Sequence, residues 1–423
     1  MDKFIIKGGN PLNGTIPISG SKNAALPLMA ASLLGDSETT ITNIPRLKDI
    51  YTFNNVLRVS GAHVNFEEEK NTLSIDPTHV NHLEAPYDLV RKMRASFYML
   101  GALVGKHGEA KVSLPGGCAW GPRPVDLHLK GMEAMGINIS LEKGYVIAKA
   151  DKKLKGGTFT LDPSSVGATI NLLLASVLRA EKFVIKNAAK EPDVVQLCKV
   201  LIKMGADIKG IGTDILTIRG VDSLSGVEIH NDPDRIELGT FMIAGAMHPD
   251  SELTLTGCNP EHLGDFTPFF KKTGAKVDID GDVITVKAPE KIKPVSIKTE
   301  VYPGFPTDLQ AQWATMMTQA DGNSKVTDTV YFDRFSYVPE LVRLGADMDV
   351  EKNTVRISGK TPLKGASVMS TDLRASVSLV LAALVAENSS EVLRIYHLDR
   401  GYESLEQKLQ AVGADIKRLD ENE

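Results

Sequence analysis

The stretch LIKMGADI, residues 201–208, decides the fold, because it joins the end of an amphipathic helix to the start of a short strand through Gly205. Glycine directly after a helical pattern is typical of a left-handed C-cap, which residues with a Cβ adopt only with strain. The pattern recurs in VLRVSGAHV, MEAMGINI, FKKTGAKV, LVRLGADM and LQAVGADI. The six glycines follow one another at intervals of about 70 residues and are Gly61, Gly136, Gly205, Gly274, Gly345 and Gly413. We therefore expect six copies of one unit.

The unit can be traced from Thr158 onward. It reads as strand TFTLD, a helix from Val166, strand KFVIKN, helix PDVVQLCKVLIKMG and a hairpin, which is the order βαβαββ. Alternating sequence with a turn signal follows each of the first five glycines, as in KVDIDGDVITV with Asp280 and Gly281 at the bend. A second helix in each unit, such as ATINLLLASVL or ASVSLVLAALVA, is apolar on most faces and is expected to be buried centrally.

A repeat of this kind could build an open solenoid. A unit that holds its own sheet and two helices is long for a solenoid, however. Three such units that close around one helical core would make a compact domain of about 200 residues. The predicted fold is therefore α/β, with two lobes of three βαβαββ units packed around central buried helices. Turn residues near Gly20 and at 231–234 predict the crossings between lobes, so one lobe is expected to hold residues 1–20 and 233–423 and the other residues 21–232.

Composition favours a globular protein of a reducing compartment. The 423 residues are 42% hydrophobic and 24% charged, with a formal net charge of −5. An acidic balance without a basic stripe argues against a nucleic-acid partner. Three scattered cysteines, Cys118, Cys198 and Cys258, do not make a disulfide framework. The start lacks the apolar core of a secretion signal and the longest apolar stretches are too short for a bilayer span, so we expect a cytoplasmic protein without a membrane partner.

The first candidate for chemistry is ISGSKNAALPLMAASLL, residues 18–34. Ser21 fits an N-cap and places Lys22 and Asn23 in the first turn of a buried helix. Free backbone N–H groups, the positive helix end and an ammonium group together form an anion site. The alternative is an exposed lysine on an ordinary capped helix.

The second candidate is LPGGCAWGPRPVDLHL, residues 114–129. Its three prolines and three glycines exclude a helix or a central strand, so the segment is expected to be a loop that acts as a lid. Cys118 lies near Arg123, which would lower the pKa of the thiol and suit it to proton donation or nucleophilic attack. The alternative for Cys118 is a small buried residue without chemistry, and this is the expectation for Cys198 and Cys258.

Charged residues at repeated positions form the third group. FPTDLQAQ carries Asp308 and STDLRAS carries Asp372, each at the head of a buried helix. Such an aspartate is ordinarily an N-cap, but two equivalent carboxylates could also share a substrate hydroxyl as general base and orienting group. Arginines of the recurring tripeptide RAS and of nearby loops are Arg94, Arg374, Arg334 and Arg400. Arginines in an acidic protein favour recognition of phosphate or carboxylate, although a single one is more often part of a surface ion pair.

No metal site and no cofactor are predicted. The nine histidines do not lie at spacings matched by cysteine or carboxylate partners. Neither a Walker A loop nor a GxGxxG motif occurs in the sequence.

Eight segments between residues 19 and 403 carry a resemblance. They are SGSKNAALP, MRAS, LPGGCAWGPRPVDLH, SVGAT, FPTDLQAQ, VPELVRLGAD, TDLRAS and IYHLDRGYE. Together, and in this order, they resemble the enolpyruvyl transferase family, and within it the branch that uses UDP-N-acetylglucosamine. The resemblance implies an inside-out α/β barrel of two lobes, each of three βαβαββ units, which agrees with the repeat count.

The resemblance also implies a reaction. The enolpyruvyl group of phosphoenolpyruvate is transferred to the 3′-hydroxyl of UDP-N-acetylglucosamine with release of phosphate, by addition at C2 followed by elimination. This is the first committed step of peptidoglycan precursor synthesis, which implies roles in cell wall biogenesis, cell shape, the cell cycle and cell division. The implied partners are the two small-molecule substrates.

Individual residues take roles from the same resemblance. Cys118 matches the proton donor to C3 of the enol, and Asp308 matches the base that takes the hydroxyl proton. Phosphoenolpyruvate binding falls on Lys22, Asn23, Arg123 and Arg400, of which Lys22 and Arg400 are also expected to be catalytic. Nucleotide-sugar binding falls on Arg94, Arg123, Pro124, Val125, Asp126, Leu127, Ser165, Val166, Gly167, Asp308 and Val330. Supporting roles near the reacting centre fall on Asp372, Arg374 and Arg334.

Two alternatives stay open beside this function. The sister enolpyruvyl transferase acting on shikimate 3-phosphate shares the fold, although the cysteine-bearing PGGCAWGPRP loop fits the sugar-nucleotide branch better. A catalytically silent binding paralogue is disfavoured, because a silent copy has no physical need for Lys22, Cys118, Arg123, Asp308 and Arg400 together.

Overall fold

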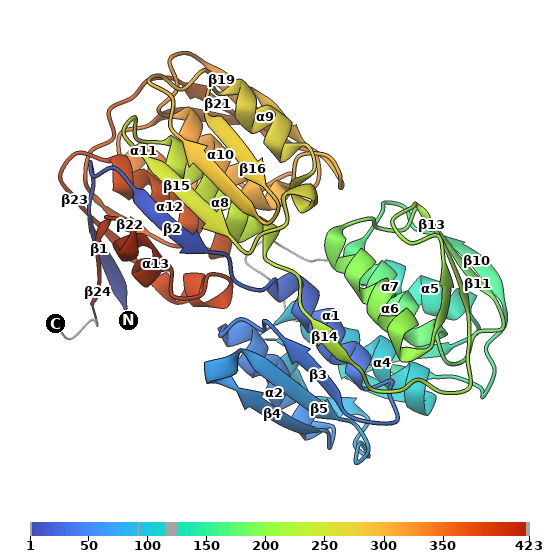
Figure 1. The fold of residues 1–423 in the computed structure, drawn as a ribbon. Coiled ribbons are helices and arrows are strands. Elements are labelled where there is room, and N and C mark those ends of the chain that lie inside the picture. Colours follow the sequence, from blue (N-terminus) through green and yellow to red (C-terminus); the bar gives the residue numbers. More distant parts are fainter. Residues whose placement is uncertain (1, 92, 116–124, 420–423) are drawn as a thin grey trace. The chain divides into compact units, whose positions relative to one another are not determined.

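The computed structural model describes residues 2–91, 93–115 and 125–419. The chain folds into two compact units, one made of Met1–Ser19 and Pro233–Glu423 and the other of Gly20–Asp232. Each unit has its own hydrophobic core and consists of three four-stranded sheets around three central helices (Figure 1). Within the described ranges, no helix combines the length and the apolar character that crossing a membrane requires.

The unit Gly20–Asp232 has central helices that are buried on nearly every face. They are α1 (Lys22–Ser32), α4 (Tyr98–His107) and α6 (Val166–Ser176), and α4 packs on both α6 and α1. Half-buried helices cover the core, namely α2 (Lys48–Val59), α5 (Asp126–Ala134) and α7 (Pro192–Met204). Short helical turns are η1 (Glu68–Lys70), α3 (Tyr87–Val90) and η2 (Arg94–Phe97).

The sheets of this unit are, in strand order, β14-β3-β5-β4, β6-β7-β9-β8 and β10-β11-β13-β12. The first comprises Glu228–His230, Thr39–Thr42, Thr72–Asp76 and His63–Glu67. The second comprises Glu84–Ala85, Glu109–Ser113, Tyr145–Lys149 and Asn138–Glu142. The third comprises Gly157–Thr160, Phe183–Lys186, Ile215–Arg219 and Asp207–Lys209.

The other unit repeats the plan. Its central helices are α8 (Arg235–Ala246), α10 (Gln310–Met317) and α12 (Leu373–Val385), with α10 packed on both α8 and α12. Its covering helices are α9 (Phe266–Lys272), α11 (Val338–Arg343) and α13 (Leu405–Ala411). Short 3₁₀ turns are η3 (Pro260–Leu263), η4 (Thr307–Leu309) and η5 (Ile395–Arg400).

The sheets of this second unit are β2-β15-β17-β16, β18-β19-β21-β20 and β22-β23-β1-β24. The first comprises Asn13–Pro17, Glu252–Thr256, Val283–Lys287 and Lys276–Asp280. The second comprises Ile297–Thr299, Ser324–Asp328, Thr354–Ser358 and Asp347–Glu351. The third comprises Ser367–Met369, Ser389–Leu393, Lys3–Lys7 and Asp415–Leu419.

All six sheets have one topology, as a βαβαββ repeat requires. In β10-β11-β13-β12, for example, the edge strand β10 runs parallel to β11, and the pairs β11–β13 and β13–β12 are antiparallel. Buried and exposed residues alternate along the inner strands, as in β9, β17 and β21. Each sheet therefore has one apolar face, which it turns toward the central helices.

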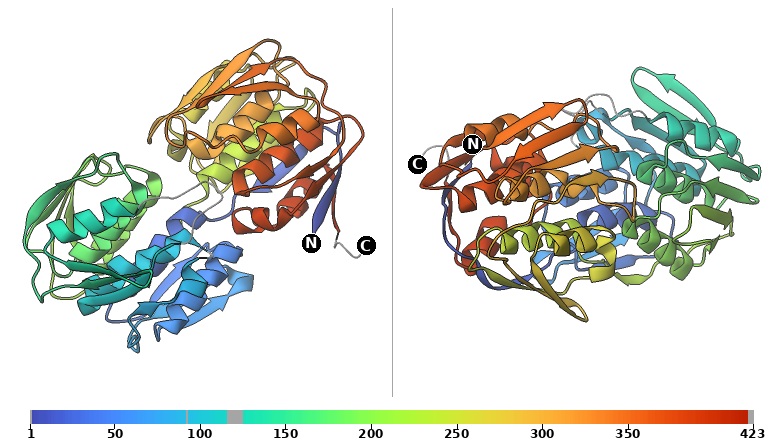
Figure 2. Two further views of the ribbon diagram at one scale, coloured as in Figure 1. Left: turned by 180° about the vertical axis from the view of Figure 1, so that it is seen from behind. Right: turned by 90° about the horizontal axis from the view of Figure 1, so that it is seen from above.

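Strand pairing departs from chain order at the crossings between the units. Strand β2 precedes α1 in the chain but pairs in parallel with β15, and β14 precedes α8 but pairs in parallel with β3. Strand β1 completes the last sheet by pairing with both β23 and β24 (Figures 1 and 2). Three repeats are thus assembled from segments that are distant in the sequence.

The six marker glycines all have positive φ. Their φ angles are +99° at Gly61, +89° at Gly136, +119° at Gly205, +96° at Gly274, +99° at Gly345 and +106° at Gly413. Side chains with a Cβ rarely adopt this conformation, so the prediction of a left-handed residue at the end of each covering helix is confirmed. The six predicted apolar helices are also confirmed as the central ones.

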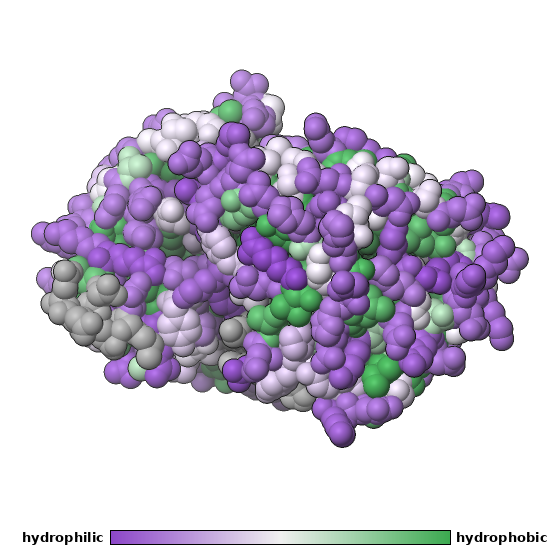
Figure 3. Space-filling view, turned by 90° about the horizontal axis from the view of Figure 1, so that it is seen from below, coloured by the Kyte–Doolittle hydropathy of each residue, from purple (hydrophilic) through white to green (hydrophobic). Residues whose placement is uncertain are grey.

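Polar side chains cover most of the molecular face drawn in Figure 3, where apolar side chains form small separate patches. Of the cysteines, Cys198 and Cys258 are buried free thiols, as expected of residues without chemistry. Burial raises the pKa of Cys198 to about 12 and that of Cys258 to about 11, so neither forms a thiolate near neutral pH.

One buried ion pair joins three segments of the second unit. Lys408 Nζ on α13 lies 2.6 Å from Glu237 Oε1 on α8 and 2.6 Å from the Ser19 hydroxyl. The backbone N–H of Ser19 donates to the other oxygen of Glu237 at 2.6 Å. Because both charged side chains are nearly inaccessible, removal of one partner would leave an uncompensated charge in the core.

We therefore predict that Lys408→Met lowers the free energy of unfolding by about 3–5 kcal/mol. The double variant Glu237→Gln, Lys408→Met should recover most of the lost free energy of unfolding, because neither position then carries a buried charge. Urea unfolding followed by circular dichroism measures both. Lys3→Met is the control, because its partner Glu391 is solvent-exposed and the loss should stay below about 1 kcal/mol. A loss as small in Lys408→Met as in the control would contradict the prediction.

Candidate active site

Helix α1 carries Lys22 in its first turn. The Ser21 hydroxyl accepts a hydrogen bond from the backbone N–H of Ala24 at 3.2 Å, so Ser21 is the N-cap that the sequence predicts. Lys22 Nζ lies 2.9 Å from Asp49 Oδ2, and the two side chains are 12% and 5% exposed. The alternative of an exposed lysine on a capped helix is therefore wrong. Asn23 follows in the same turn and is half-buried.

Asp49 is a residue that the sequence analysis missed. It lies in the first turn of α2 and is buried, and it holds the Lys22 ammonium in place. The segment LKDI contains no signal beyond an acidic residue at a helix start, which is common at helix N-termini. The result is a fixed, partly buried cation next to the positive end of α1, an arrangement that suits an anionic ligand.

Of the predicted nucleotide-binding residues of this unit that the structure describes, Arg94 begins η2 and the others lie at the starts of α5 and α6. Ser165 caps α6 by accepting a hydrogen bond from the backbone N–H of Ala168 at 3.3 Å. Val166 and Gly167 form the first turn of α6. Asp126 opens α5 and pairs with Lys130 at 3.1 Å on the solvent side of the helix. Both helix starts therefore present backbone N–H groups that lack intrahelical partners.

The structure brings these segments together around His128, a buried residue of α5. The charges of Arg94 and Asp126 both act on its ring, and Gly167 packs against the ring edge. Val125 and Leu127 flank Asp126 on the same segment and are half-buried. His128 was not among the predicted site residues. The other predicted residues of the loop, Cys118, Arg123 and Pro124, lie outside the described residues.

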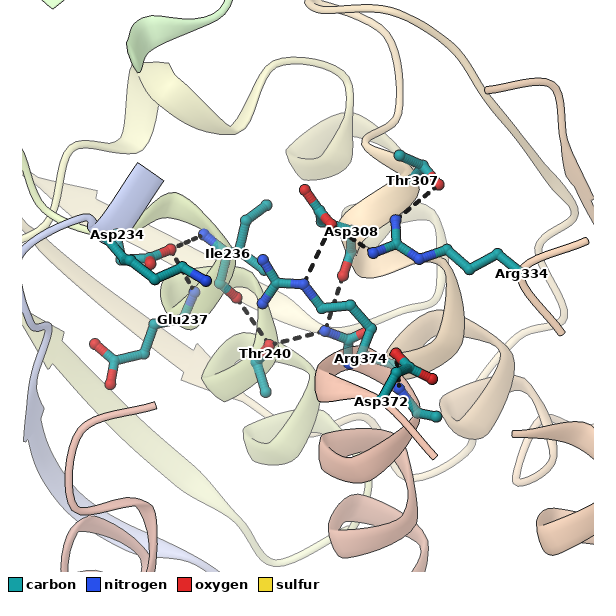
Figure 4. Close-up of polar contacts among 12 residues, drawn as sticks. Asp234, Ile236, Glu237, Thr240, Thr307, Asp308, Arg334, Asp372 and Arg374 are labelled. Atoms are coloured by element: carbon teal, nitrogen blue, oxygen red, sulfur yellow. Dashed lines mark hydrogen bonds and ion pairs between the residues drawn. The ribbon is translucent and has the colours of Figure 1, made fainter. Parts of the chain in front are cut away.

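In the other unit, Asp308 lies between two guanidinium groups (Figure 4). Its Oδ1 atom is 2.9 Å from Arg334 Nη2 and 3.2 Å from Arg374 Nε. Burial by itself would raise the pKa of this carboxyl group. The positive charges of Arg374 and Arg334, with Arg235 beyond them, outweigh burial and hold the pKa well below its usual range. Asp308 is therefore an anion throughout the working pH range and a weak base.

Asp308 and Asp372 occupy equivalent positions in the repeat but make different contacts. Asp372 is the N-cap of α12, where Oδ1 accepts from the backbone N–H groups of Arg374 at 2.9 Å and Ala375 at 3.2 Å. Its Oδ2 accepts from the Ser336 hydroxyl at 3.1 Å. Asp308 makes no such cap bond at η4. The N-cap interpretation is thus correct for Asp372 and wrong for Asp308.

Asp328, a fully buried residue at the end of β19, supports the Asp308 turn. Its Oδ2 accepts from the Thr307 hydroxyl at 2.6 Å, and Arg334 Nη1 donates to the same hydroxyl at 3.1 Å. Its Oδ1 accepts from the backbone N–H groups of Val330 and Tyr331, both at 2.8 Å. One carboxylate therefore fixes both the turn of Asp308 and the turn of Val330. The run VTDTVYFDR contains no sequence signal for this role.

A second supporting network lies behind Arg374. The hydroxyls of Tyr402 and Thr240 are 2.8 Å apart, and Arg374 Nη1 donates to Tyr402 at 3.5 Å. Gln312 Nε2 lies 3.2 Å from the Thr240 hydroxyl and 3.0 Å from the backbone carbonyl of Asp308. The network connects α8, α10 and α12 and holds the guanidinium against Asp308.

Arg400 ends η5, the 3₁₀ segment that packs against α12 in the same unit as Asp308, and its side chain is half-buried. Among residues 2–91, 93–115 and 125–419, no three His, Cys, Asp or Glu side chains form a group suited to a metal ion. The charged groups of both units thus suit anionic, hydroxyl-bearing ligands held by hydrogen bonds and ion pairs.

Comparison with known proteins places the chain in a family. The family model for EPSP synthase (3-phosphoshikimate 1-carboxyvinyltransferase) matches residues 6–409. The UDP-N-acetylglucosamine 1-carboxyvinyltransferase of Chloroherpeton thalassium is 52% identical over 99% of this chain and 97% of that protein. The protein of the same name from Desulfosudis oleivorans is 50% identical over 99% of this chain and 100% of that protein.

Solved structures agree with this assignment. The enolpyruvyl transferase NikO from Streptomyces tendae has a TM-score of 0.90 at 28% identity, covering 99% of this chain and 98% of that one. An EPSP synthase from Acinetobacter baumannii has a TM-score of 0.77 at 18% identity, covering 99% of this chain and 100% of that one, and shows the fold alone. The predicted α/β architecture of three units per lobe is confirmed. The chain belongs to the enolpyruvyl transferase family, in the branch of the UDP-N-acetylglucosamine 1-carboxyvinyltransferases.

Proposed function

We propose that the protein transfers the enolpyruvyl group of phosphoenolpyruvate to the 3′-hydroxyl of UDP-N-acetylglucosamine and releases phosphate. One observation carries the proposal: relatives named for this activity match 99% of the chain at about 50% identity. The match to solved EPSP synthases is 18% identity, which supports the shared fold rather than the shikimate substrate.

The reaction requires two proton transfers and a carbon–oxygen bond in its first half. A proton is added to C3 of the enol, the sugar hydroxyl oxygen bonds to C2, and the hydroxyl proton leaves. In the second half the C2–O bond to phosphate breaks and a proton leaves C3, which gives the enol ether and free phosphate. We assign the protonation of C3 to Cys118, which precedes Arg123 in the segment 114–129.

Asp308 receives the hydroxyl proton in this proposal. A carboxylate held ionised by Arg334 and Arg374 is a weak base, so it is suited to orient the hydroxyl group and accept its proton late. The hydroxyl becomes strongly acidic as its oxygen bonds to C2, and a weak base then suffices. Arg374 and Arg334 keep the carboxylate in position, and Asp372 supports Arg374 by capping α12.

The anionic groups of the substrates are assigned to the cations and helix starts. We propose Lys22, Asn23, Arg123 and Arg400 for phosphoenolpyruvate, because its phosphate and carboxylate need fixed positive charge. Lys22 fits this role as a partly buried cation held by Asp49. For the nucleotide sugar we propose Arg94, Arg123, Pro124, Val125, Asp126, Leu127, Ser165, Val166, Gly167, Asp308 and Val330.

The cellular role follows from this chemistry. We propose that the product is the first committed intermediate of peptidoglycan precursor synthesis, so that the protein acts in cell wall biogenesis, cell shape, the cell cycle and cell division. Both substrates are small soluble anions, which supports action in the cytoplasm without a nucleic-acid or membrane partner.

The acceptor is tested first. With phosphoenolpyruvate present, UDP-N-acetylglucosamine should cause release of inorganic phosphate and shikimate 3-phosphate should not, as measured with a colorimetric phosphate assay. Phosphoenolpyruvate alone is the control. Equal release with shikimate 3-phosphate would favour the sister activity, and no release with either acceptor would favour a silent paralogue.

Replacing the proposed base should stop turnover. Asp308→Asn keeps the shape of the side chain but cannot accept a proton, and we expect kcat to fall by at least about 100-fold. Asp321→Asn is the matched control, because that carboxylate pairs with Lys291 on the surface and kcat should not change. Circular dichroism verifies that both variants fold. Turnover of Asp308→Asn within threefold of the unmodified protein would remove Asp308 as the base.

The proposed proton donor is tested by alkylation. A small epoxide phosphonate that resembles phosphoenolpyruvate should add once per chain, at Cys118, as seen by mass spectrometry of the digested protein. Cys198 and Cys258 are internal controls, because their raised pKa values of about 12 and about 11 keep them as thiols at pH 7. An adduct on Cys198 in place of Cys118 would refute the assignment.

A further inference from the structure

A wholly buried asparagine lies behind the start of α6. Asn171 Oδ1 accepts a hydrogen bond from the backbone N–H of Gly101 at 2.9 Å. Its Nδ2 lies 3.1 Å from the backbone carbonyl of Phe97 and 2.8 Å from His128 Nδ1. A backbone N–H can only donate and a carbonyl can only accept, so these two contacts determine which end of the amide faces His128. That end is the NH₂ group.

The amide therefore selects one form of the histidine ring. Because Nδ2 donates, His128 Nδ1 accepts, and the ring proton is on Nε2. Burial lowers the pKa of His128 to about 3, with the positive charge of Arg94 acting in the same direction and Asp126 opposing. Among the described residues, Arg94 and Asp126 are the charged groups that act on the His128 ring. The Phe97 ring packs edge-on against the His128 ring. The ring is thus neutral at working pH.

The N–H group of this ring faces the start of α6. A Cβ atom at Gly167 would lie 3.2 Å from His128 Cε1 and 3.3 Å from Nε2, so the Cε1–Nε2 edge lies against the backbone of the first helical turn. His128 is 4% exposed, and none of the described residues bonds to its Nε2. The helix start thus has a second donor beside its own N–H groups, and no side chain or backbone group of the described residues accepts from it.

We propose that Asn171 is a positioning residue that holds His128 in the one tautomer that presents an N–H donor, rather than a lone pair, to an anionic oxygen bound at the start of α6. The inference rests on the proposed function, since the acceptor substrate carries a diphosphate. The inference explains why the apolar helix ATINLLLAS contains the polar residue Asn171. It also assigns His128 to the part of the site that binds the nucleotide. The opposite tautomer would turn a lone pair toward the phosphate oxygens and repel them.

The main test is Asn171→Asp, with UDP as the probe and isothermal titration calorimetry as the measurement. A carboxylate at this position accepts from Nδ1–H and raises the pKa of His128. Below the new pKa both ring nitrogens are protonated and UDP should bind as it does to the unmodified protein. Above it Nε2 carries a lone pair, and the affinity should fall by about tenfold relative to the unmodified protein at the same pH.

A second pair of variants keeps the inference testable where the buried carboxylate prevents folding. In His128→Gln the side-chain NH₂ can reach the position of Nε2, and the Kd for UDP should stay within about threefold. His128→Asn is too short to reach it, and the Kd should rise by about tenfold. His107→Gln, in the last turn of α4, is the control and should bind UDP as the unmodified protein does. Thermal melting verifies folding.

The outcomes separate this inference from the proposed function. ¹⁵N NMR of the histidine side chains reports the tautomer without any ligand, and a proton on Nδ1 of His128 would overturn the inference alone. A folded Asn171→Asp variant with unchanged UDP affinity between pH 6 and 9 would do the same. In turnover assays, Asn171→Asp above the new pKa and His128→Asn should raise the KM for the nucleotide sugar and leave the KM for phosphoenolpyruvate unchanged. If the unmodified protein binds neither UDP nor the sugar nucleotide, the proposed function itself fails.

Discussion

Each central helix is apolar on nearly every face, and this constraint shapes the rest of both units. Such a helix must be surrounded by protein, so three sheets with one apolar face each enclose three helices. Ionised groups are therefore confined to the helix ends, where backbone N–H groups lack intrahelical partners. A polar or charged residue stands at or just before the first turn of each of the six central helices. These residues are Lys22, Arg94, Ser165, Arg235, Asp308 and Asp372.

Because the central helices are buried, polar residues inside them need hydrogen-bond partners within the protein. Asn171, Thr240 and Gln312 are buried, and a buried polar group needs hydrogen-bond partners. Asn171 lies 2.8 Å from His128 Nδ1, and the side chains of Thr240 and Gln312 contact the Tyr402 hydroxyl, to which Arg374 donates. His128 and Arg374 are the side chains to which we assign roles in the proposed function.

Equivalent positions of the repeat do not imply equivalent roles. The sequence predicts correctly that Asp308 and Asp372 each stand at the head of a buried helix. It cannot predict that only Asp372 caps its helix, because the difference comes from Arg334 and Arg374, which approach Asp308 from other segments. The supporting roles of Asp49 and Asp328 were not predicted for the same reason, because their partners are close in space but distant in sequence.

The sequence by itself determined the six units, the glycine that ends each covering helix and the identity of the central helices, because these follow from local periodicity and from the backbone freedom of glycine. Turn residues near Gly20 and at 231–234 also predicted which lobe holds β1, β2 and β14. Only the tertiary structure decided that β2 pairs with β15, β14 with β3, and β1 with both β23 and β24. Backbone hydrogen bonding between strands is nearly independent of side-chain identity. Which strand fills an open edge is therefore decided by where the chain passes in three dimensions, and no local pattern records it.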